Sequence, residues 1–271
     1  MRVLTVSRIA TRFSQLKSAQ RKALIPFITA GDPSLEATVP VMHALVEAGA
    51  DVIELGVPFS DPMADGPTIQ RSSEQALRRG AGLRYVLRTV AEFRQRDADT
   101  PVVLMGYLNP IEIHGYARFA EEAIGAGVDG VLLVDLPPEE AAEARELFSR
   151  HGVDLIALAS PTTTPERMTM LSGSAQGYLY YVSFAGVTGA GHLDTQAAGL
   201  RLHDLRAQAR VPVVAGFGIK DAASAVAMAR EADGVVVGSA LVAHLADARD
   251  SADAALRAAA FLRPLRAALD A

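Results

Sequence analysis

The chain has 271 residues, half of them hydrophobic, which suits one large α/β domain or two ordinary ones. Only 21% are charged, the net charge is −5 and the basic residues are scattered, so neither disorder nor nucleic-acid binding is expected. The absence of Cys excludes disulfides and thiolate chemistry, and the six His form no helix-spaced ligand pair, so no metal site is expected. No apolar run is long enough to span a membrane and no signal peptide is apparent, so we expect a cytoplasmic protein without a membrane partner.

Eight short apolar runs recur along the chain and are typical of parallel strands that are buried on both faces. They cover Ala23–Ile28, Val52–Leu55, Val102–Met105, Gly130–Val134, Leu155–Ala159, Tyr178–Val182, Val211–Ala215 and Gly234–Val237.

Helical patterns separate these runs, and two more helices are expected outside the strict alternation. The separating helices are predicted at Leu35–Ala48, Thr68–Arg79, Ile111–Ala126, Pro138–Arg150, Thr195–Ala209 and Ala222–Ala232. One extra helix, Arg8–Ala19, precedes the first strand and could cover the bottom of a barrel, and another is predicted at Leu83–Arg96. Eight β-then-α units without a linker indicate a single (β/α)₈-barrel (TIM-barrel) domain over residues 1–271, with an open doubly wound sheet as the alternative.

Glu54 is the first candidate for chemistry, because it interrupts the apolar second strand. A carboxyl in the barrel lumen would be desolvated, which raises its pKa toward neutrality and suits it to acid–base work. The alternative is a structural Glu paired with a nearby cation.

The loop after Glu54 carries Asp61 and Asp65 among three prolines and a glycine, so its shape is defined. Asp65 precedes Gly66 and Pro67 at the start of a predicted helix. A catalytic role and an ordinary helix N-cap are therefore both open for Asp65.

Glycines follow the last three strands, which is where barrels of this kind usually bind phosphate. The glycines lie in Ala185–Gly191, in Ala215–Ile219 and at Gly238, and Ser239 opens a short helix. Their backbone N–H groups and the Ser239 hydroxyl could surround a dianion, although each glycine could also serve only its turn.

Aromatic residues at strand ends could hold a flat substrate, although core filling is the simpler account. They are Phe27, Tyr107, Tyr180 and Phe217.

Several of these segments together resemble the signature of the tryptophan synthase α subunit family. The resemblance runs from about residue 8 to 265, with the segments in order. They are Pro26–Pro33, Glu54–Pro62, Ala64–Gln70, Met105–Pro110, Gly186–Ala190 and Gly216–Ile219.

The resemblance implies cleavage of indole-3-glycerol phosphate to indole and glyceraldehyde 3-phosphate without a cofactor. It implies that Glu54 protonates indole C3 and then helps to deprotonate the side-chain hydroxyl, while Asp65 binds the ring N–H. It implies two further sets of contacts. Those to indole would come from Phe27, Met105, Tyr107, Leu132 and Tyr180, and those to phosphate from Gly189, Gly218, Gly238 and Ser239, with Phe217 nearby.

The same resemblance implies a partner, the pyridoxal-phosphate β subunit, in an α₂β₂ heterotetramer. Pro58–Pro62, which contains Asp61, and Asn109–His114 would contact it, and Gly186–Asp194, which contains Thr188, would close over the substrate. Phe184 departs from the polar or basic residue of many members, which affects only the expected lid. Two alternatives stay open: another phosphate-binding barrel isomerase, and a subunit that mainly activates its partner.

Overall fold

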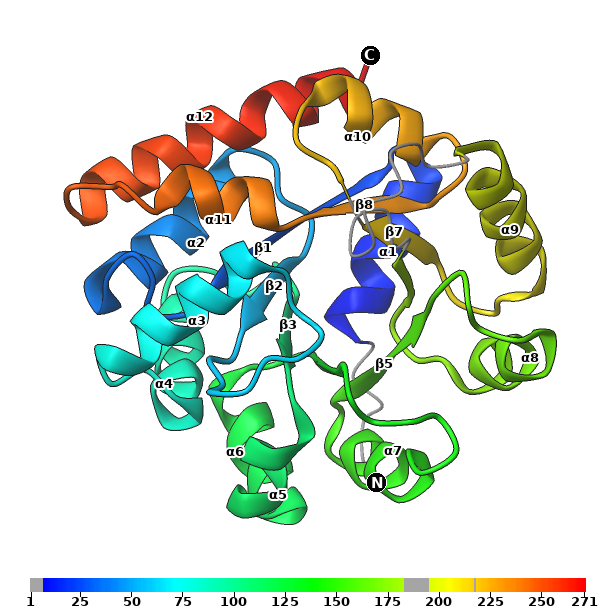
Figure 1. Ribbon diagram of the computed structural model, residues 1–271, viewed down its shortest axis with the longest axis horizontal. Helices are drawn as coiled ribbons and strands as arrows, with labels where there is room; N and C mark the ends of the chain where they lie inside the picture. Colours follow the sequence, from blue (N-terminus) through cyan, green and yellow to red (C-terminus); the bar gives the residue numbers. More distant parts are fainter. Residues whose placement is uncertain (1–6, 183–194, 217) are drawn as a thin grey trace.

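The computed structural model describes residues 7–182, 195–216 and 218–271. Eight parallel strands close into a barrel in chain order, so the predicted (β/α)₈ barrel is confirmed and the open sheet is wrong (Figure 1). All eight predicted strands lie within two residues of the observed ones. The strands are β1 (Ala23–Thr29), β2 (Ile53–Gly56), β3 (Val102–Gly106), β4 (Gly130–Leu133), β5 (Asp154–Ala159), β6 (Leu179–Val182), β7 (Val213–Gly216) and β8 (Gly234–Val237).

Helices surround the barrel, and most were predicted. They are α1 (Arg8–Ser18), the short 3₁₀ turn η1 (Leu35–Ala37), α2 (Thr38–Glu47), α3 (Pro67–Arg78), α4 (Leu83–Phe93), α5 (Leu108–His114), α6 (Tyr116–Ala126), α7 (Ala142–His151), α8 (Pro165–Ser174), α9 (Thr195–Gln208), α10 (Ala222–Ala229), α11 (Ser239–Leu245) and α12 (Ser251–Leu269).

Two helical predictions need correction, and two helices were missed. The helix predicted at Ile111–Ala126 is two helices, because Gly115 between them has φ +89°, which interrupts a right-handed helix. The helix predicted from Pro138 begins only at Ala142. Helices α8 and α12 were not predicted at all.

Helix α1 closes the lower end of the barrel, as predicted. Its buried face, formed by Ile9, Phe13 and Leu16, belongs to one apolar cluster with the inward-facing residues of the strands. The Phe13 ring packs against the ring of Tyr178, with 5.9 Å between the ring centroids. The lumen is therefore a packed core at its base, and only its upper end is left for a ligand.

Four side chains bridge neighbouring strands at the base of the barrel, always within the couples β1–β2, β3–β4, β5–β6 and β7–β8. Each carboxylate or amide oxygen lies just before the even-numbered strand and accepts a backbone N–H from the start of the odd-numbered one. The acceptor and donor residues are Asp51 with Leu24 (2.9 Å), Asp129 with Val102 (2.8 Å), Gln176 with Leu155 (2.9 Å) and Asp233 with Val213 (2.9 Å).

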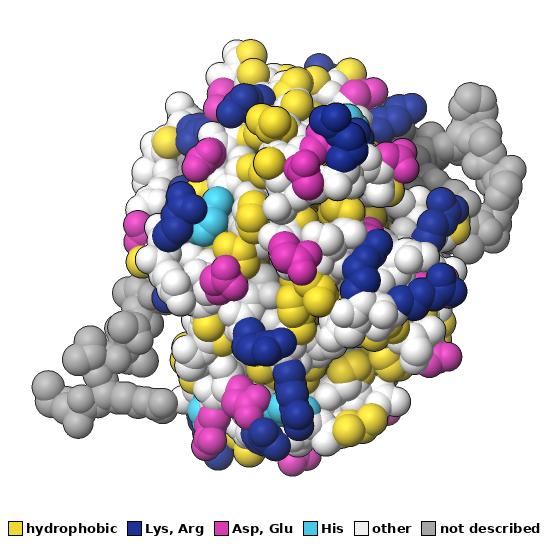
Figure 2. All heavy atoms as spheres, turned by 90° about the vertical axis from the view of Figure 1, so that its left-hand side faces the viewer, with side chains coloured by type: hydrophobic (Ala, Val, Ile, Leu, Met, Phe, Trp, Pro, Cys, Tyr) yellow, Lys and Arg dark blue, Asp and Glu magenta, His cyan; other side chains and the backbone are white. Residues whose placement is uncertain are grey.

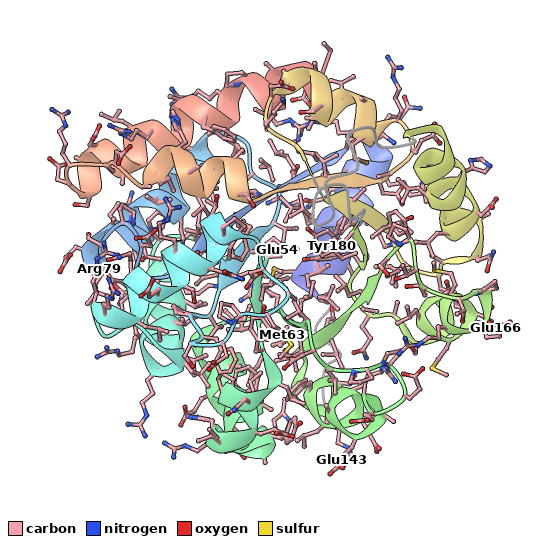
Figure 3. All side chains as sticks on the ribbon, in the orientation of Figure 1. Glu54, Met63, Arg79, Glu143, Glu166 and Tyr180 are labelled. Atoms are coloured by element: carbon pink, nitrogen blue, oxygen red, sulfur yellow. The ribbon has the colours of Figure 1, made fainter. Side chains whose placement is uncertain are left out.

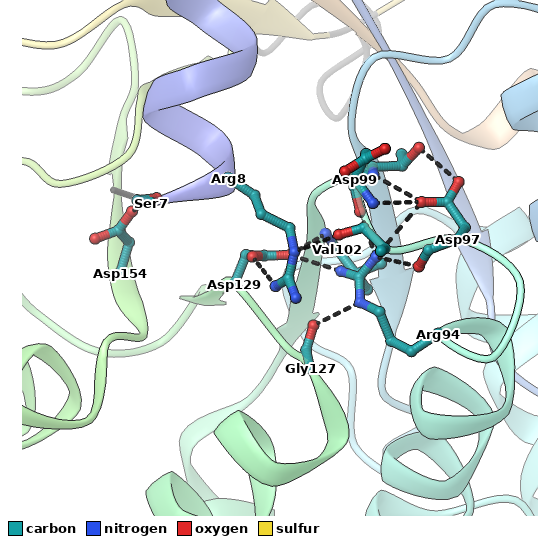
Figure 4. A network of polar contacts seen from close by, with 11 residues as sticks. Ser7, Arg8, Arg94, Asp97, Asp99, Val102, Gly127, Asp129 and Asp154 are labelled. Carbon is teal, nitrogen blue, oxygen red and sulfur yellow. Dashed lines mark hydrogen bonds and ion pairs between the residues drawn. The ribbon is translucent and has the colours of Figure 1, made fainter. Parts of the chain in front are cut away.

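The bridge at Asp129 is also the centre of an ion-pair network (Figure 4). Its two carboxylate oxygens pair with Arg8 of α1 and Arg94 at the end of α4, each at 2.7 Å. The Arg94 guanidinium also donates to the backbone carbonyls of Gly127 and Thr100. This network ties α1 and α4 to the start of β4.

On the face that carries α2, α3 and α4, basic and acidic side chains are interspersed and form no single-sign stripe (Figure 2). Among the helices that the structure describes, none is both long and apolar enough to cross a membrane.

Replacement of Asp129 by Ala should destabilise the barrel strongly. The substitution would remove the main charged partner of Arg94, whose side chain is only 10% exposed. It would also remove the acceptor of the Val102 N–H. Loss of one partner of a buried ion pair costs about 3–5 kcal/mol in the free energy of unfolding, which urea titration would measure.

Glu146→Ala is the matched control, because its partner Arg150 is exposed on the same helix, α7. That change should cost less than about 1 kcal/mol. An equal effect of the two substitutions would contradict the structural role of the Asp129 network.

Candidate active site

The predicted catalytic and indole-binding residues of the strands line the lumen together. Phe27 is the register partner of Glu54 on the next strand, and Met105 is the partner of Leu132. Leu132 and Tyr180 are buried in the lumen cluster, and Met105 packs against it. Side chains alternate between the two faces of a strand, so these residues share the inner face above α1.

The Glu54 side chain crosses the lumen. Its carboxyl is completely buried, and its Oε1 accepts a hydrogen bond of 2.6 Å from the hydroxyl of Tyr178, just before β6 on the far side of the barrel. In the described part of the chain its other oxygen, Oε2, has no hydrogen-bond partner. Among the described residues no cation pairs with Glu54, so the structural alternative of an ion pair finds no support there.

This environment gives Glu54 the titration behaviour of a proton donor and acceptor. Burial raises the pKa of Glu54 to about 7, against the smaller lowering effect of the Tyr178 hydrogen bond. Both protonation states of the carboxyl are therefore accessible near neutral pH, which is the requirement for general acid–base catalysis.

Asp65 is not the cap of the helix that follows it. The N-cap of α3 is Gly66, and no side chain caps it. Instead, Asp65 Oδ2 accepts a hydrogen bond of 3.1 Å from the hydroxyl of Tyr107, which itself accepts one from the Ala64 N–H at 3.0 Å. Burial raises the pKa of the half-buried Asp65 carboxyl, and the hydrogen bond from Tyr107 lowers it.

The loop that carries Asp65 is fastened to the barrel at several points. The ring of Phe59 stacks on Tyr107, with 5.1 Å between centroids. The backbone of Phe59 exchanges two hydrogen bonds with the Ser73 hydroxyl, at 2.9 and 3.0 Å. Asp61 is exposed at the tip of the loop and accepts a hydrogen bond from Ser60. Asp65 is thus held in place by its neighbours, whereas Asp61 faces solvent.

Tyr180 connects the two carboxyls electrostatically. Its hydroxyl is buried, and after desolvation the charges of Glu54 and then Asp65 are the causes that raise its pKa well above the usual value. Glu54 and Tyr180 both lie in the middle of the barrel (Figure 3). Both carboxyls therefore act on one region of the lumen.

A pocket opens above this region at the upper end of the barrel. Its lining includes Asp65, Tyr107, Phe27 and Met105. Gly56 lies on its wall, and a Cβ at that position would be 2.7 Å from the Phe27 ring, so only glycine leaves room for this ring. Glu54 is two residues below Gly56 and therefore lies under the pocket.

Part of the predicted phosphate site is described, at the upper ends of β7 and β8. Gly216 pairs with Val236, which brings the following Gly218 and Gly238 to neighbouring strand ends. Gly218 has φ +67°, a conformation that favours glycine, and Gly238 is the N-cap residue of α11, whose first residue, Ser239, is exposed. Gly189, Phe217 and Thr188, with the lid expected at Gly186–Asp194, lie outside the described residues.

Sequence reasoning missed Tyr178. It was included in the sixth predicted strand without a role, although it is the hydrogen-bond partner of Glu54. The signal was the alternation Tyr178-Leu179-Tyr180, which puts both tyrosines on the inner face. Among the described residues, no group of three or more His, Asp or Glu could hold a metal ion.

Comparison with known proteins decides the family. The family model described as tryptophan synthase alpha chain matches residues 13–269. Tryptophan synthase alpha chains of Xanthomonas euvesicatoria and Xanthomonas campestris are 75% and 74% identical to the chain, over 97% of its length and 98% and 97% of theirs. The chain belongs to the tryptophan synthase alpha chain family.

Solved structures of the family agree with the barrel described above. The alpha subunit of Legionella pneumophila superposes with a TM-score of 0.92 at 46% identity, covering 98% of this chain and 99% of that one. A tryptophan synthase complex from Pyrococcus furiosus matches with a TM-score of 0.82 at 38% identity, over 90% of this chain and 98% of that one. The resemblance seen in the motifs is confirmed, and the isomerase and the mainly activating subunit are not favoured.

The raised pKa of Glu54 predicts a pH-dependent cost in stability. Between about pH 4.5, where an unfolded Glu loses its proton, and about pH 7, the native protein keeps a proton that the unfolded chain has released. The free energy of unfolding should therefore fall as pH rises, by up to about 3 kcal/mol relative to Glu54→Gln.

Urea unfolding of the wild type and Glu54→Gln at the two ends of this pH window measures the effect. Glu74→Gln, on the exposed surface of α3, is the control and should follow the wild type. If the free energies of unfolding of the wild type and Glu54→Gln differ by the same amount at both pH values, Glu54 titrates normally.

Removal of the Tyr178 hydroxyl should raise the pKa of Glu54 above about 7, because this hydrogen bond stabilises the ionised carboxylate. The carboxyl resonance of Glu54 in ¹³C-labelled Tyr178→Phe would report the change directly. Tyr180→Phe is the matched control, because it removes a hydroxyl from the same strand region and leaves the hydrogen bond from Tyr178 to Glu54 in place. If the carboxyl resonance of Glu54 titrates with the same midpoint pH in Tyr178→Phe and in the wild type, the hydrogen bond has no effect on the pKa of Glu54.

Proposed function

We propose that Glu54 and Asp65 together carry out the cleavage of indole-3-glycerol phosphate to indole and glyceraldehyde 3-phosphate. The reaction follows from membership of the tryptophan synthase alpha chain family, whose members are carbon–carbon lyases in the last steps of tryptophan synthesis. The observation that carries the assignment of residues is the buried Glu54 carboxyl, with a pKa raised to about 7 and one oxygen that has no hydrogen-bond partner among the described residues.

Glu54 supplies and then recovers the proton. In its neutral form it donates a proton to indole C3, which makes that carbon tetrahedral and leaves positive charge on the ring nitrogen. The ionised carboxylate then takes the proton of the side-chain hydroxyl as the carbon–carbon bond breaks and its electrons return to the ring. The products are indole and an aldehyde, and Glu54 is neutral again, so one carboxyl completes the cycle.

Asp65 stabilises the charge that develops on the ring nitrogen. As a carboxylate at the mouth of the pocket, it accepts the ring N–H, and Tyr107 holds it in that orientation. Such an interaction strengthens as positive charge builds up, so it favours the transition state over the substrate.

The remaining contacts orient the substrate between these two groups. Phe27, Met105, Tyr107, Leu132 and Tyr180 hold the indole, and the phosphate lies on Gly189, Gly218, Gly238 and Ser239, beside Phe217. The described phosphate residues support this arrangement, because Gly238 is in van der Waals range of Phe27: a Cβ there would be 3.6 Å from Phe27 Cβ. The indole and phosphate ends of the site are thus adjacent.

The assembly follows the family as well. The chain needs no cofactor of its own and forms a complex with the β subunit, which contains pyridoxal phosphate. We assign the contact surface to Pro58–Pro62 with Asp61 and to Asn109–His114; the high exposure of Met63 (80%) and Ile113 (84%), in or beside these segments, supports it. An α₂β₂ heterotetramer, a single domain over residues 1–271, a lid at Gly186–Asp194 with Thr188, and a cytoplasmic location belong to the same proposal.

Glu54→Gln and Asp65→Asn should each lower the rate of indole formation by about 10²–10⁴-fold, because each removes a group that acts on the reacting ring. Indole release would be followed with the purified chain, alone and with the β subunit. Glu74→Gln, a charge-to-amide change on the exposed surface of α3, should be as active as the wild type. Full activity of Glu54→Gln would remove the proposed acid, and a loss below about tenfold in Asp65→Asn would return Asp65 to a structural role.

A further inference from the structure

The barrel wall has a seam between β4 and β5. The register of these two strands ends at Leu132 and Ile156, although β5 continues to Ala159. Above that point β5 pairs only with β6, at Ala157–Ala159, and the end of β4 bonds to β3 through Val134 N–H and the Gly106 carbonyl. Residues of both strand ends, Leu133 to Asp135 and Leu155 to Ser160, line a space that reaches toward the helix layer.

A pocket of about 290 Å³ fills this seam and reaches the space between α7 and α8. In Figure 3 the labels of Glu143 and Glu166 mark these two helices. The volume is near the lower end of the range for small-molecule sites, roughly 300 Å³. Val134 lines both this pocket and the one beside Asp65, so it separates the two.

The walls of the seam pocket are mainly apolar. They are Leu133, Val134, Leu136, Pro137, Pro138, Ala141, Leu155, Ile156, Ala157, Leu158, Ala159 and Leu171. Such walls favour a ligand with a compact apolar body.

Three charged side chains line the pocket, Arg145, Arg167 and Asp135, and Asp135 Oδ1 accepts the Leu108 N–H at 2.8 Å. Arg145 of α7 lines the pocket, and its buried Nε has no hydrogen-bond partner among the described residues. The second arginine of the pocket, Arg167, is already engaged, because its guanidinium binds both oxygens of Glu139 at 2.7 and 2.8 Å. A buried donor without an acceptor is costly, so Arg145 is where an anion would be stabilised.

The hydroxyls at the rim are occupied by one another. Ser160 N–H donates to Thr163 Oγ1, and the Ser160 hydroxyl lies within hydrogen-bond distance of the hydroxyls of Thr162 and Thr163. Among the described residues of the pocket, Arg145 therefore offers a guanidinium that no ion pair engages, in a mainly apolar lining that also contains Asp135. That combination matches a carboxylate better than a phosphate dianion, which needs several donors.

We propose that the seam pocket is a second ligand site, in which Arg145 binds the carboxylate of a small organic acid and the strand ends enclose its apolar body. Arg145 lies on α7 in the helix layer and is not among the residues that line the pocket beside Asp65, so the two sites use different charged groups.

Benzoate is a suitable probe, measured by saturation-transfer NMR on the full-length chain. Benzyl alcohol has the same ring without the charge, and inorganic phosphate has the charge without the ring. All titrations are run with an excess of 3-indolepropanol phosphate, which lacks the hydroxyl needed for cleavage and occupies the catalytic pocket. We expect benzoate to bind at least about tenfold more tightly than either comparison compound, since bidentate charged hydrogen bonds are strong.

Arg145→Met keeps the aliphatic stem and should weaken benzoate binding by at least about tenfold. Arg150→Met, on the same helix and paired with Glu146 on the surface, is the matched control and should leave binding unchanged.

Equal affinity of benzoate and benzyl alcohol for the wild type would overturn the proposal without any variant. Equal affinity of benzoate for the wild type and a folded Arg145→Met would also do so, as would benzoate binding that is seen only when the indole analogue is left out. Tight, Arg145-dependent binding of inorganic phosphate would overturn the assignment to a carboxylate.

Discussion

The other residues of the lumen depend on one constraint, the burial of an ionisable carboxyl in the middle of the barrel. Glu54 has no exposed surface, and its neighbours on the adjacent strands, Phe27 and Val103, are apolar. Ionisation of Glu54 is therefore unfavourable because the carboxylate loses its hydration, and the hydrogen bond from Tyr178 offsets only part of this cost. Phe13 packs against Tyr178 from below, so the helix that closes the barrel also fixes the partner of the acid. The core of the protein and its chemistry share the same residues here.

The two carboxyls of the site are held in different ways, which suits different tasks. Glu54 belongs to a strand and shares the dry interior, whereas Asp65 belongs to a loop at the mouth. Asp65 is oriented by a residue outside its own loop, because the Tyr107 hydroxyl at the end of β3 donates a hydrogen bond to it. Because Tyr107 also stacks on Phe59, the position of Asp65 depends on the whole loop being folded against the barrel. A contact that disturbs this loop, such as a partner surface, would reach Asp65 directly.

Much of the fold could be predicted from the sequence, because a parallel strand buried on both faces is a continuous apolar run. For the same reason Glu54 was a clear exception within its strand. Other features depend on distant or ambiguous partners. Tyr178 is 124 residues from Glu54, and no local pattern connects them. The sequence Asp65-Gly66-Pro67 fits a helix cap as well as a site carboxylate, and only the hydrogen bond from Tyr107 separates the two.

The remaining errors have local causes. Helix α12 was missed because it follows the last strand, so no later strand marked its end. It also contains Pro264, a residue that is unusual inside a helix. Arg145 looks like any surface arginine of an amphipathic helix, and only the structure shows that its Nε is buried with no hydrogen-bond partner among the described residues. The bridges at the base are formed by Asp51, Asp129, Gln176 and Asp233. Each bridge joins the two strands of one couple, whereas the seam lies between β4 and β5, which belong to different couples. At the base these two strands are joined by the backbone, through the hydrogen bond from the Asp154 N–H to the Asp129 carbonyl at 2.9 Å.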